Sequence, residues 1–225
     1  MRLRSFFVAM VLTAMTSFSM AQQSVTTIFG ADNSFAGNTF DVSSATGATI
    51  TGFDINLAAD PAIAQTIAVY YKLGTAVGSE NTAGAWTLLG TDNNVLSNGL
   101  DVPTPVSVPS LDLAAGQVYG FYVDLVSYNT LGSNSTFVSS DSGDRGGSII
   151  AYTNGGPTDY TDGNVTITTN TGQASPAFSG SFFPREWNGT VHYSIASVPT
   201  LGEFGMAAMI LLMVGAGVYF MKRRA

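Results

Sequence analysis

Short stretches in which apolar and polar residues alternate recur along most of this chain and constrain its fold more than any other feature. Within 66–73 every second side chain is apolar, from Ile67 to Leu73, as in a strand with one buried face. The same period of two recurs at 50–57, 118–126 and 187–195. No helical period of useful length appears between Gln22 and Ser197, so the pattern predicts an all-β domain, an antiparallel β-sandwich of jelly-roll type.

Shorter strands and their connections are read from composition. Further strands are expected at 26–29, 38–42, 86–90, 148–152, 165–168 and 177–183. Segment 103–109 suits an edge strand or an extended connection, because proline cannot donate to a central ladder. Turn residues predict a break at Asp92-Asn93-Asn94 and a long loop at 127–147.

The charge balance limits the classes of partner. Segment 22–197 contains three basic residues, Lys72, Arg145 and Arg185, against 14 acidic ones, which gives a formal charge of −11. Nucleic acid is excluded as a partner because phosphates need Lys and Arg to neutralise them. Divalent cations and neutral polymers remain open. The chain has no cysteine, which excludes a disulfide scaffold, a thiol nucleophile, an iron–sulfur centre and a zinc finger.

Residues 1–21 have the three parts of a secretory signal peptide. Arg2 and Arg4 form a positive beginning, 6–18 is apolar, and Ser19-Met20-Ala21 matches a small-x-small cleavage site. The mature chain is therefore expected to begin at Gln22.

The end of the chain has the composition of a membrane anchor. From 204 to 221 only Tyr219 is ionisable, and about 18 residues at about 1.5 Å each span about 27 Å, enough for a bilayer core. Such a segment should be helical, because backbone groups in lipid must pair internally. Lys222, Arg223 and Arg224 follow it and place the C-terminus in the cytoplasm, with the rest outside the inner membrane. A plain tail anchor is the simplest interpretation.

An octet directly before this run favours a more specific interpretation. Its sequence is Val198-Pro199-Thr200-Leu201-Gly202-Glu203-Phe204-Gly205. It closely resembles the Ile-Pro-Thr-Leu-x-x-Trp-Gly signature of IPTL-CTERM sorting domains, the tripartite tails of Gram-negative bacteria related to the PEP-CTERM tails that exosortases process. Motif, hydrophobic helix and basic cluster occur here in that order within 198–225, with Val198 and Phe204 as the two departures. The resemblance implies recognition by an exosortase-like peptidase. Pro199 favours an extended backbone for 198–201, accessible to such an enzyme.

A second resemblance concerns the exported domain. Segments 67–71, 85–90 and 113–123 look like bacterial surface domains that occur attached to several alternative anchors. This likeness implies a β-sandwich of unassigned function.

Few residues suggest catalysis. His192 is the only histidine, and no Gly-x-Ser-x-Gly elbow accompanies it, so it is interpreted as an ordinary strand residue rather than a catalytic base. One histidine without cysteine makes a poor zinc site. Glu80 and Glu186 could form a glycosidase pair with each other or with an Asp, but solvated loop acids are the simpler interpretation.

Two loops could supply oxygen ligands to calcium. These are Asp141 with Asp144, and Asp159 with Asp162 and Asn164, although neither matches a calcium-loop pattern and turn chemistry explains both. No other cofactor is expected. The tyrosines at 70, 122, 152 and 160 could stack on sugar rings, whereas packing on the sheet faces is the favoured interpretation.

These observations predict a non-catalytic, exported protein. The cargo would be held in the periplasm by the inner membrane and then released to the cell surface or extracellular matrix. A carbohydrate-binding module for the organism's own exopolysaccharide is the alternative function, and a glycan or ester hydrolase is the third.

Overall fold

A computed structural model describes residues 22–129, 148–195 and 201–223. The chain divides into two units, one from Gln22 to Ile195 and one formed by the two terminal segments. The predicted signal peptide, motif residues 198–200, Arg224, Asp141 and Asp144 lie outside the described residues.

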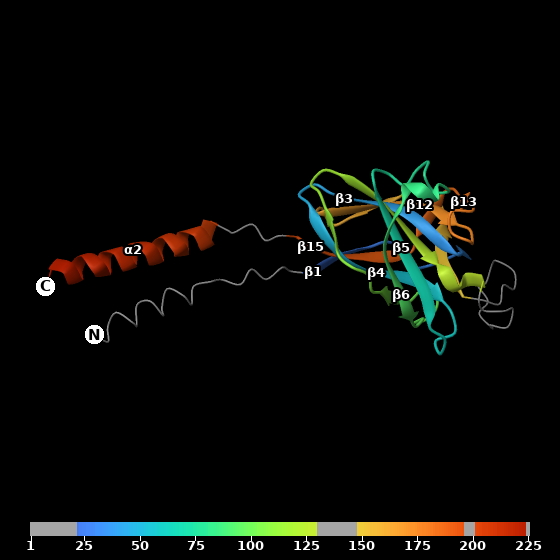
Figure 1. The fold of residues 1–225 in the computed structure, drawn as a ribbon, viewed down its shortest axis with the longest axis horizontal. Helices are drawn as coiled ribbons and strands as arrows, with labels where there is room; N and C mark the ends of the chain where they lie inside the picture. Colours follow the sequence, from blue (N-terminus) through green and yellow to red (C-terminus); the bar gives the residue numbers. More distant parts are fainter. Residues whose placement is uncertain (1–21, 130–147, 196–200, 224–225) are drawn as a thin grey trace. The chain divides into compact units, whose positions relative to one another are not determined.

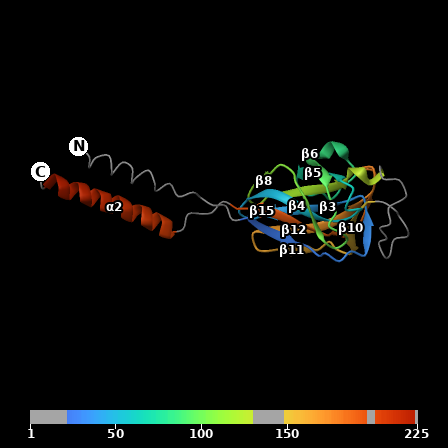
Figure 2. The ribbon, with the colours of Figure 1, turned by 90° about the horizontal axis from the view of Figure 1, so that it is seen from below.

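Two antiparallel sheets make up the unit from Gln22 to Ile195 (Figures 1 and 2). The eight-stranded sheet has the order β1 (Gln22–Thr26), β15 (Gly189–Ser194), β4 (Ala48–Ala58), β10 (Ile149–Asn154) and β14 (Arg185–Trp187). Off this path, β2 (Asn33–Phe35) pairs with β10, while β7 (Pro103–Val106) and β8 (Leu111–Leu113) pair with β4.

The seven-stranded sheet has the order β11 (Asp159–Thr161), β12 (Val165–Gln173), β3 (Gly37–Ser44), β9 (Val118–Leu125), β5 (Gln65–Leu73) and β6 (Thr87–Val95). Strand β13 (Ser181–Phe182) pairs with β12. Figure 1 shows β5 running through the middle of this unit. Two short 3₁₀ helices, η1 (Ala83–Ala85) and η2 (Val126–Asn129), lie in the connections.

One hydrophobic core joins the two sheets. Phe40 and Phe121 of the seven-stranded sheet and Phe53 and Trp187 of the eight-stranded sheet are each at most 1% exposed. The Trp187 ring stacks on Phe40 with 3.8 Å between centroids. Burying one such side chain contributes about 1.5–3 kcal/mol, so the apolar face of each strand pairs the sheets into a sandwich-like arrangement.

Three of the four strongly alternating strands were predicted correctly, whereas the strand expected at 187–195 is divided between β14, which ends at Trp187, and β15, which begins at Gly189. Two of the weaker strands were also wrong. β5, β9 and β4 confirm the strands expected at 66–73, 118–126 and 50–57. The strand expected at 177–183 is wrong except at Ser181–Phe182, and the one expected at 26–29 ends at Thr26. The turn expected at 92–94 is wrong, because β6 continues through it while Asp92 Oδ2 accepts a hydrogen bond from the Ser107 N–H at 2.9 Å.

In the terminal unit, α2 runs from Leu201 to Arg223 and contains the run 204–221. Leu201 is helical, which corrects the extended conformation expected for it. Lys222 and Arg223 in the last turn suit the helix dipole. Among the residues that the structure describes, no helix has the length and apolar character needed to cross a membrane.

Candidate functional site

The solvent-facing side of the eight-stranded sheet carries a histidine–aspartate pair. His192 Nε2 lies 2.8 Å from Asp54 Oδ2, and the two side chains are 28% and 16% exposed. Because β15 pairs His192 with Gly52 and Thr190 with Asp54, the two side chains are diagonal neighbours on one face. The sequence placed His192 on a strand but gave no sign of its partner, which is 138 residues away.

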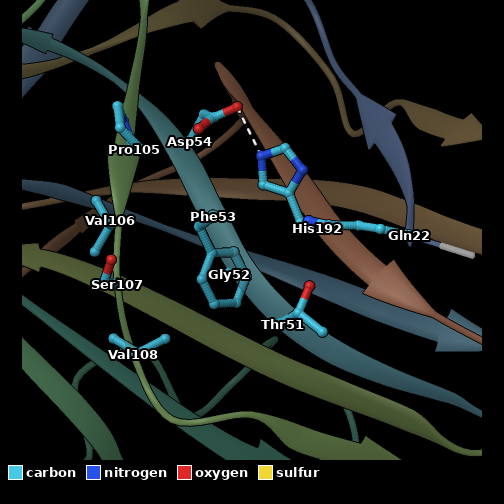
Figure 3. Close-up of a pocket in the computed structure, with 10 residues that line it drawn as sticks. All are labelled: Gln22, Thr51, Gly52, Phe53, Asp54, Pro105, Val106, Ser107, Val108 and His192. Carbon is cyan, nitrogen blue, oxygen red and sulfur yellow. Dashed lines mark hydrogen bonds and ion pairs between the residues drawn. The ribbon is translucent and has the colours of Figure 1, made fainter. Parts of the chain in front are cut away.

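A hollow forms beside this pair because strand β4 lacks neighbours there. A β-bulge between His192 and Tyr193 leaves Thr51 without an opposite residue on β15. On the other edge of β4, β7 ends opposite Phe53 and β8 begins opposite Ile50. The resulting hollow has a volume of about 210 Å³. Figure 3 shows His192 between Asp54 and Gln22, with the β7 side of the hollow opposite.

The lining of this hollow is suited to hydrogen bonding rather than to nucleophilic catalysis. Thr51 and Ser107 supply hydroxyls, and Gln22 supplies an amide. The only interaction drawn among the lining residues in Figure 3 is the His192–Asp54 contact, so neither hydroxyl is bonded to the imidazole. If Nε2 donates to Asp54, Nδ1 remains as an acceptor. The described lining therefore offers donors and acceptors for a polar ligand but no paired nucleophile and base.

Glu186 is fixed by hydroxyl groups. Its Oε2 accepts a hydrogen bond from Tyr160 Oη at 2.9 Å, and its Oε1 accepts one from Thr158 Oγ1. Burial and the neighbouring Glu186 carboxylate raise the pKa of Tyr160 to about 12. Glu186 therefore lies on strand β14 with both carboxylate oxygens bonded to hydroxyls, and among the described residues no interaction links it with Glu80.

In the segment around Asp159 and Asp162, both carboxylates accept hydrogen bonds from other groups of the protein. Asp159 Oδ1 accepts from Thr168 Oγ1 at 2.6 Å, while Asp162 Oδ1 accepts from the N–H groups of Asn164 and Val165 at 3.0 and 3.1 Å. Asp162 Oδ2 also accepts from a tyrosine hydroxyl, that of Tyr193. Partial burial alone would raise the pKa of Asp162, but these hydrogen bonds outweigh it and lower the pKa. Within the described ranges no cluster of three or more His, Asp or Glu residues could hold a metal.

The four tyrosines considered for sugar stacking pack against the protein. Tyr122 and Tyr152 are 0% and 2% exposed, and Tyr70 and Tyr160 are half-buried. Packing, the favoured interpretation, is therefore confirmed. The exposed aromatic side chains in the described part of 22–195 are instead Phe182 and Phe183.

The sequence was compared with models of protein families, and no family model matches. No curated protein matches the chain either.

Proposed function

We propose that this chain is an exported, non-catalytic envelope protein of a Gram-negative bacterium. Residues 1–21 direct export, and cleavage leaves Gln22 as the first residue. The segment 204–221 spans the inner membrane, with 222–224 in the cytoplasm and the β domain in the periplasm. An exosortase-like peptidase recognises the motif 198–205, and the β domain, which we take to be a jelly roll, passes to the cell surface or matrix.

The observation that carries this proposal is the combination of motif, apolar run and basic cluster in the last 28 residues. Two structural features support it. The segment 204–221 lies within the helix Leu201–Arg223, and the apolar side chains of Leu211 and Leu212 are each 73% exposed. Neighbouring apolar side chains that are this exposed favour an apolar environment, which a lipid bilayer supplies.

Intact mass of the protein from inner-membrane and extracellular fractions tests the proposal. We expect a species outside the inner membrane that begins at Gln22 and ends within or near 198–205. A matched variant, Pro199→Ala with Leu201→Ala, should retain residues to Ala225 and remain in the inner membrane. A wild-type chain found only in the inner membrane with Ala225 intact would contradict sorting and leave a plain anchor.

A carbohydrate-binding role is the second candidate, favoured by the polar hollow beside His192 and Asp54. Small hydroxyl and amide groups of this kind suit a polyhydroxylated ligand, and the charge of −11 on 22–197 favours a neutral one.

Titration calorimetry with the organism's own exopolysaccharide tests this second role. His192→Ala should weaken saturable binding about tenfold, the effect of losing about 1.4 kcal/mol of polar contacts. Asn93→Ala, on an exposed position of β6, is the control and should bind like wild type. Equal affinity in wild type, His192→Ala and Asn93→Ala would show that the hollow is not the carbohydrate-binding site.

A further inference from the structure

Three aromatic side chains form a socket on the solvent-facing side of the seven-stranded sheet. Tyr70 on β5 is paired in register with Tyr122 on β9, and their ring centroids are 5.9 Å apart. Trp86, at the end of segment 74–86, lies over Tyr122 with 5.9 Å between centroids. Its indole N–H is fixed by a 2.9 Å hydrogen bond to the Ser79 carbonyl. These three rings are called the aromatic socket below.

Phe178 fills the aromatic socket from outside the sheet. Its ring centroid lies 4.9 Å from Tyr122, 5.2 Å from Tyr70 and 6.4 Å from Trp86. It belongs to the short segment 174–180 between β12 and β13, which closes on itself through a 2.9 Å hydrogen bond from Ala174 N–H to the Gly180 carbonyl. The segment is therefore a small flap that carries one aromatic side chain into the socket.

The backbone of Phe178 is strained in this position. Its φ of +64° lies in the left-handed region, which bulky side chains rarely adopt. Its N–H donates to Tyr122 Oη at 3.4 Å, a long contact. Because strain at a non-glycine residue persists only where packing enforces it, the contacts of the ring hold the flap closed, and a competing ligand would relieve the strain on displacing it.

An unpartnered carboxylate lies beside the socket. Asp124 is two residues beyond Tyr122 on the same face of β9, and it pairs with Ala68, two residues before Tyr70 on β5. The residue is 5% exposed, and no hydrogen bond or ion pair joins its side chain to any described residue, although its oxygens are not among the fully enclosed polar atoms that lack a partner. A largely buried carboxylate without a protein partner is costly to keep charged, and a cation or a hydrogen-bond donor beside it would lower that cost.

We propose that the aromatic socket with Asp124 is a binding site for a small molecule that bears a protonated amine, and that Phe178 occupies the site in the free protein. The faces of Trp86, Tyr70 and Tyr122 attract a cation, and Asp124 supplies the opposite charge. The ligand displaces the Phe178 ring and the flap opens. This site is separate from the hollow at His192 and does not depend on export or sorting.

The test uses the full-length chain in a neutral detergent at pH 8.5, with n-butylammonium as the probe and 1-butanol as its uncharged counterpart. The Trp86 indole N–H resonance, assigned with Trp86→Phe, reports occupancy of the socket. We expect a saturable shift with n-butylammonium in wild type and binding at least tenfold weaker with 1-butanol. Phe178→Gly, which removes the ring and suits the left-handed backbone, should bind n-butylammonium at least tenfold more tightly.

Two further variants separate a charged site from a mere cavity. Asp124→Asn should weaken binding of n-butylammonium at least tenfold and leave binding of 1-butanol unchanged. Phe183→Ala, a substitution of an exposed phenylalanine near the flap, is the control and should bind like wild type. Far-UV circular dichroism confirms that each variant folds, and Phe178→Ala replaces Phe178→Gly if the latter does not.

Three results would overturn the proposal. The first is equal affinity of Phe178→Gly for n-butylammonium and 1-butanol, because any cavity left by a missing ring binds apolar molecules. The second is unchanged affinity in Asp124→Asn. The third is the absence of a saturable shift in both wild type and Phe178→Gly.

Discussion

Two buried aspartates on the outer face of the seven-stranded sheet differ in what surrounds their carboxylates. Asp41, 9% exposed, accepts hydrogen bonds from Thr75 Oγ1 at 2.5 Å and from the Ala76 N–H at 2.7 Å. Burial raises its pKa, and these bonds offset part of the effect. Asp124 has no such donors, and burial raises its pKa to about 7. Asp41 thus holds segment 74–86 against the sheet, whereas no described residue donates a hydrogen bond to the Asp124 carboxylate.

The raised pKa of Asp124 predicts a pH-dependent stability. The folded state holds the proton up to about pH 7, whereas the unfolded chain releases it near 3.8, so the free energy of unfolding should fall as pH rises between these values. The loss amounts to at most about 4 kcal/mol above pH 7. Asp124→Asn should remove the part of this fall that Asp124 causes, leave the contribution of Asp41, whose pKa is also raised, and stabilise the protein at pH 8, as measured by urea unfolding at pH 4.5 and pH 8.

The surroundings of Asp124 supply the control for this measurement. Tyr70 and Tyr122 face it from the sheet, and both have pKa values raised by burial and by Asp124, so neither titrates in the window. The flap 174–180 contributes no ionisable side chain, and segment 74–86 contributes Glu80. Glu80→Gln removes one charge without altering the buried carboxylate and should keep the wild-type pH dependence. An Asp124→Asn variant with the same pH dependence as wild type would contradict the assignment.

At the scale of strands, the sequence reveals elements that follow from a local pattern but not features that depend on contacts between distant residues. β5 and β9 were predictable because alternation is a local signal that a half-buried strand requires. The hollow at Thr51 was not, because it depends on a bulge against β15 and on where β7 and β8 stop along β4. No local signal marks such a site, since its residues meet only after the sheet forms.

The flap shows a second limit of local sequence patterns, because here an apolar pattern predicted a strand that the structure does not form. Its residues 177–180 were expected to extend the strand that exists only at Ser181–Phe182. Their apolar character was read correctly, but Phe178 packs across the outer face of the sheet instead of continuing β13. An apolar residue followed by Ser and Gly is compatible with either arrangement, and the Tyr70–Tyr122 pair on distant strands decides between them.

At the scale of the whole chain, the sequence assigns folding and localisation to different segments. The residues of the hydrophobic core, including those packed at its margin, fall between Val25 and Ile195. The described part of the terminal unit, residues 201–223, contributes none of them. The fold of the β domain should therefore not depend on the tail, as the sorting proposal requires of a domain that is released by cleavage.

Removing the tail tests this independence. A chain of residues 22–195 should have the same free energy of unfolding as a chain of residues 22–225, within about 0.5 kcal/mol, because the deletion leaves the core intact. Urea unfolding of both chains in the same neutral detergent, followed by the fluorescence of Trp86 and Trp187, gives the comparison. A chain of 22–195 that unfolds more than about 1 kcal/mol more easily would show that the tail stabilises the domain, and cleavage near 198–205 would then release a weakened protein. Equal stability would mean that a sorting enzyme can cut the tail without any consequence for the two sheets or the sites on their outer faces.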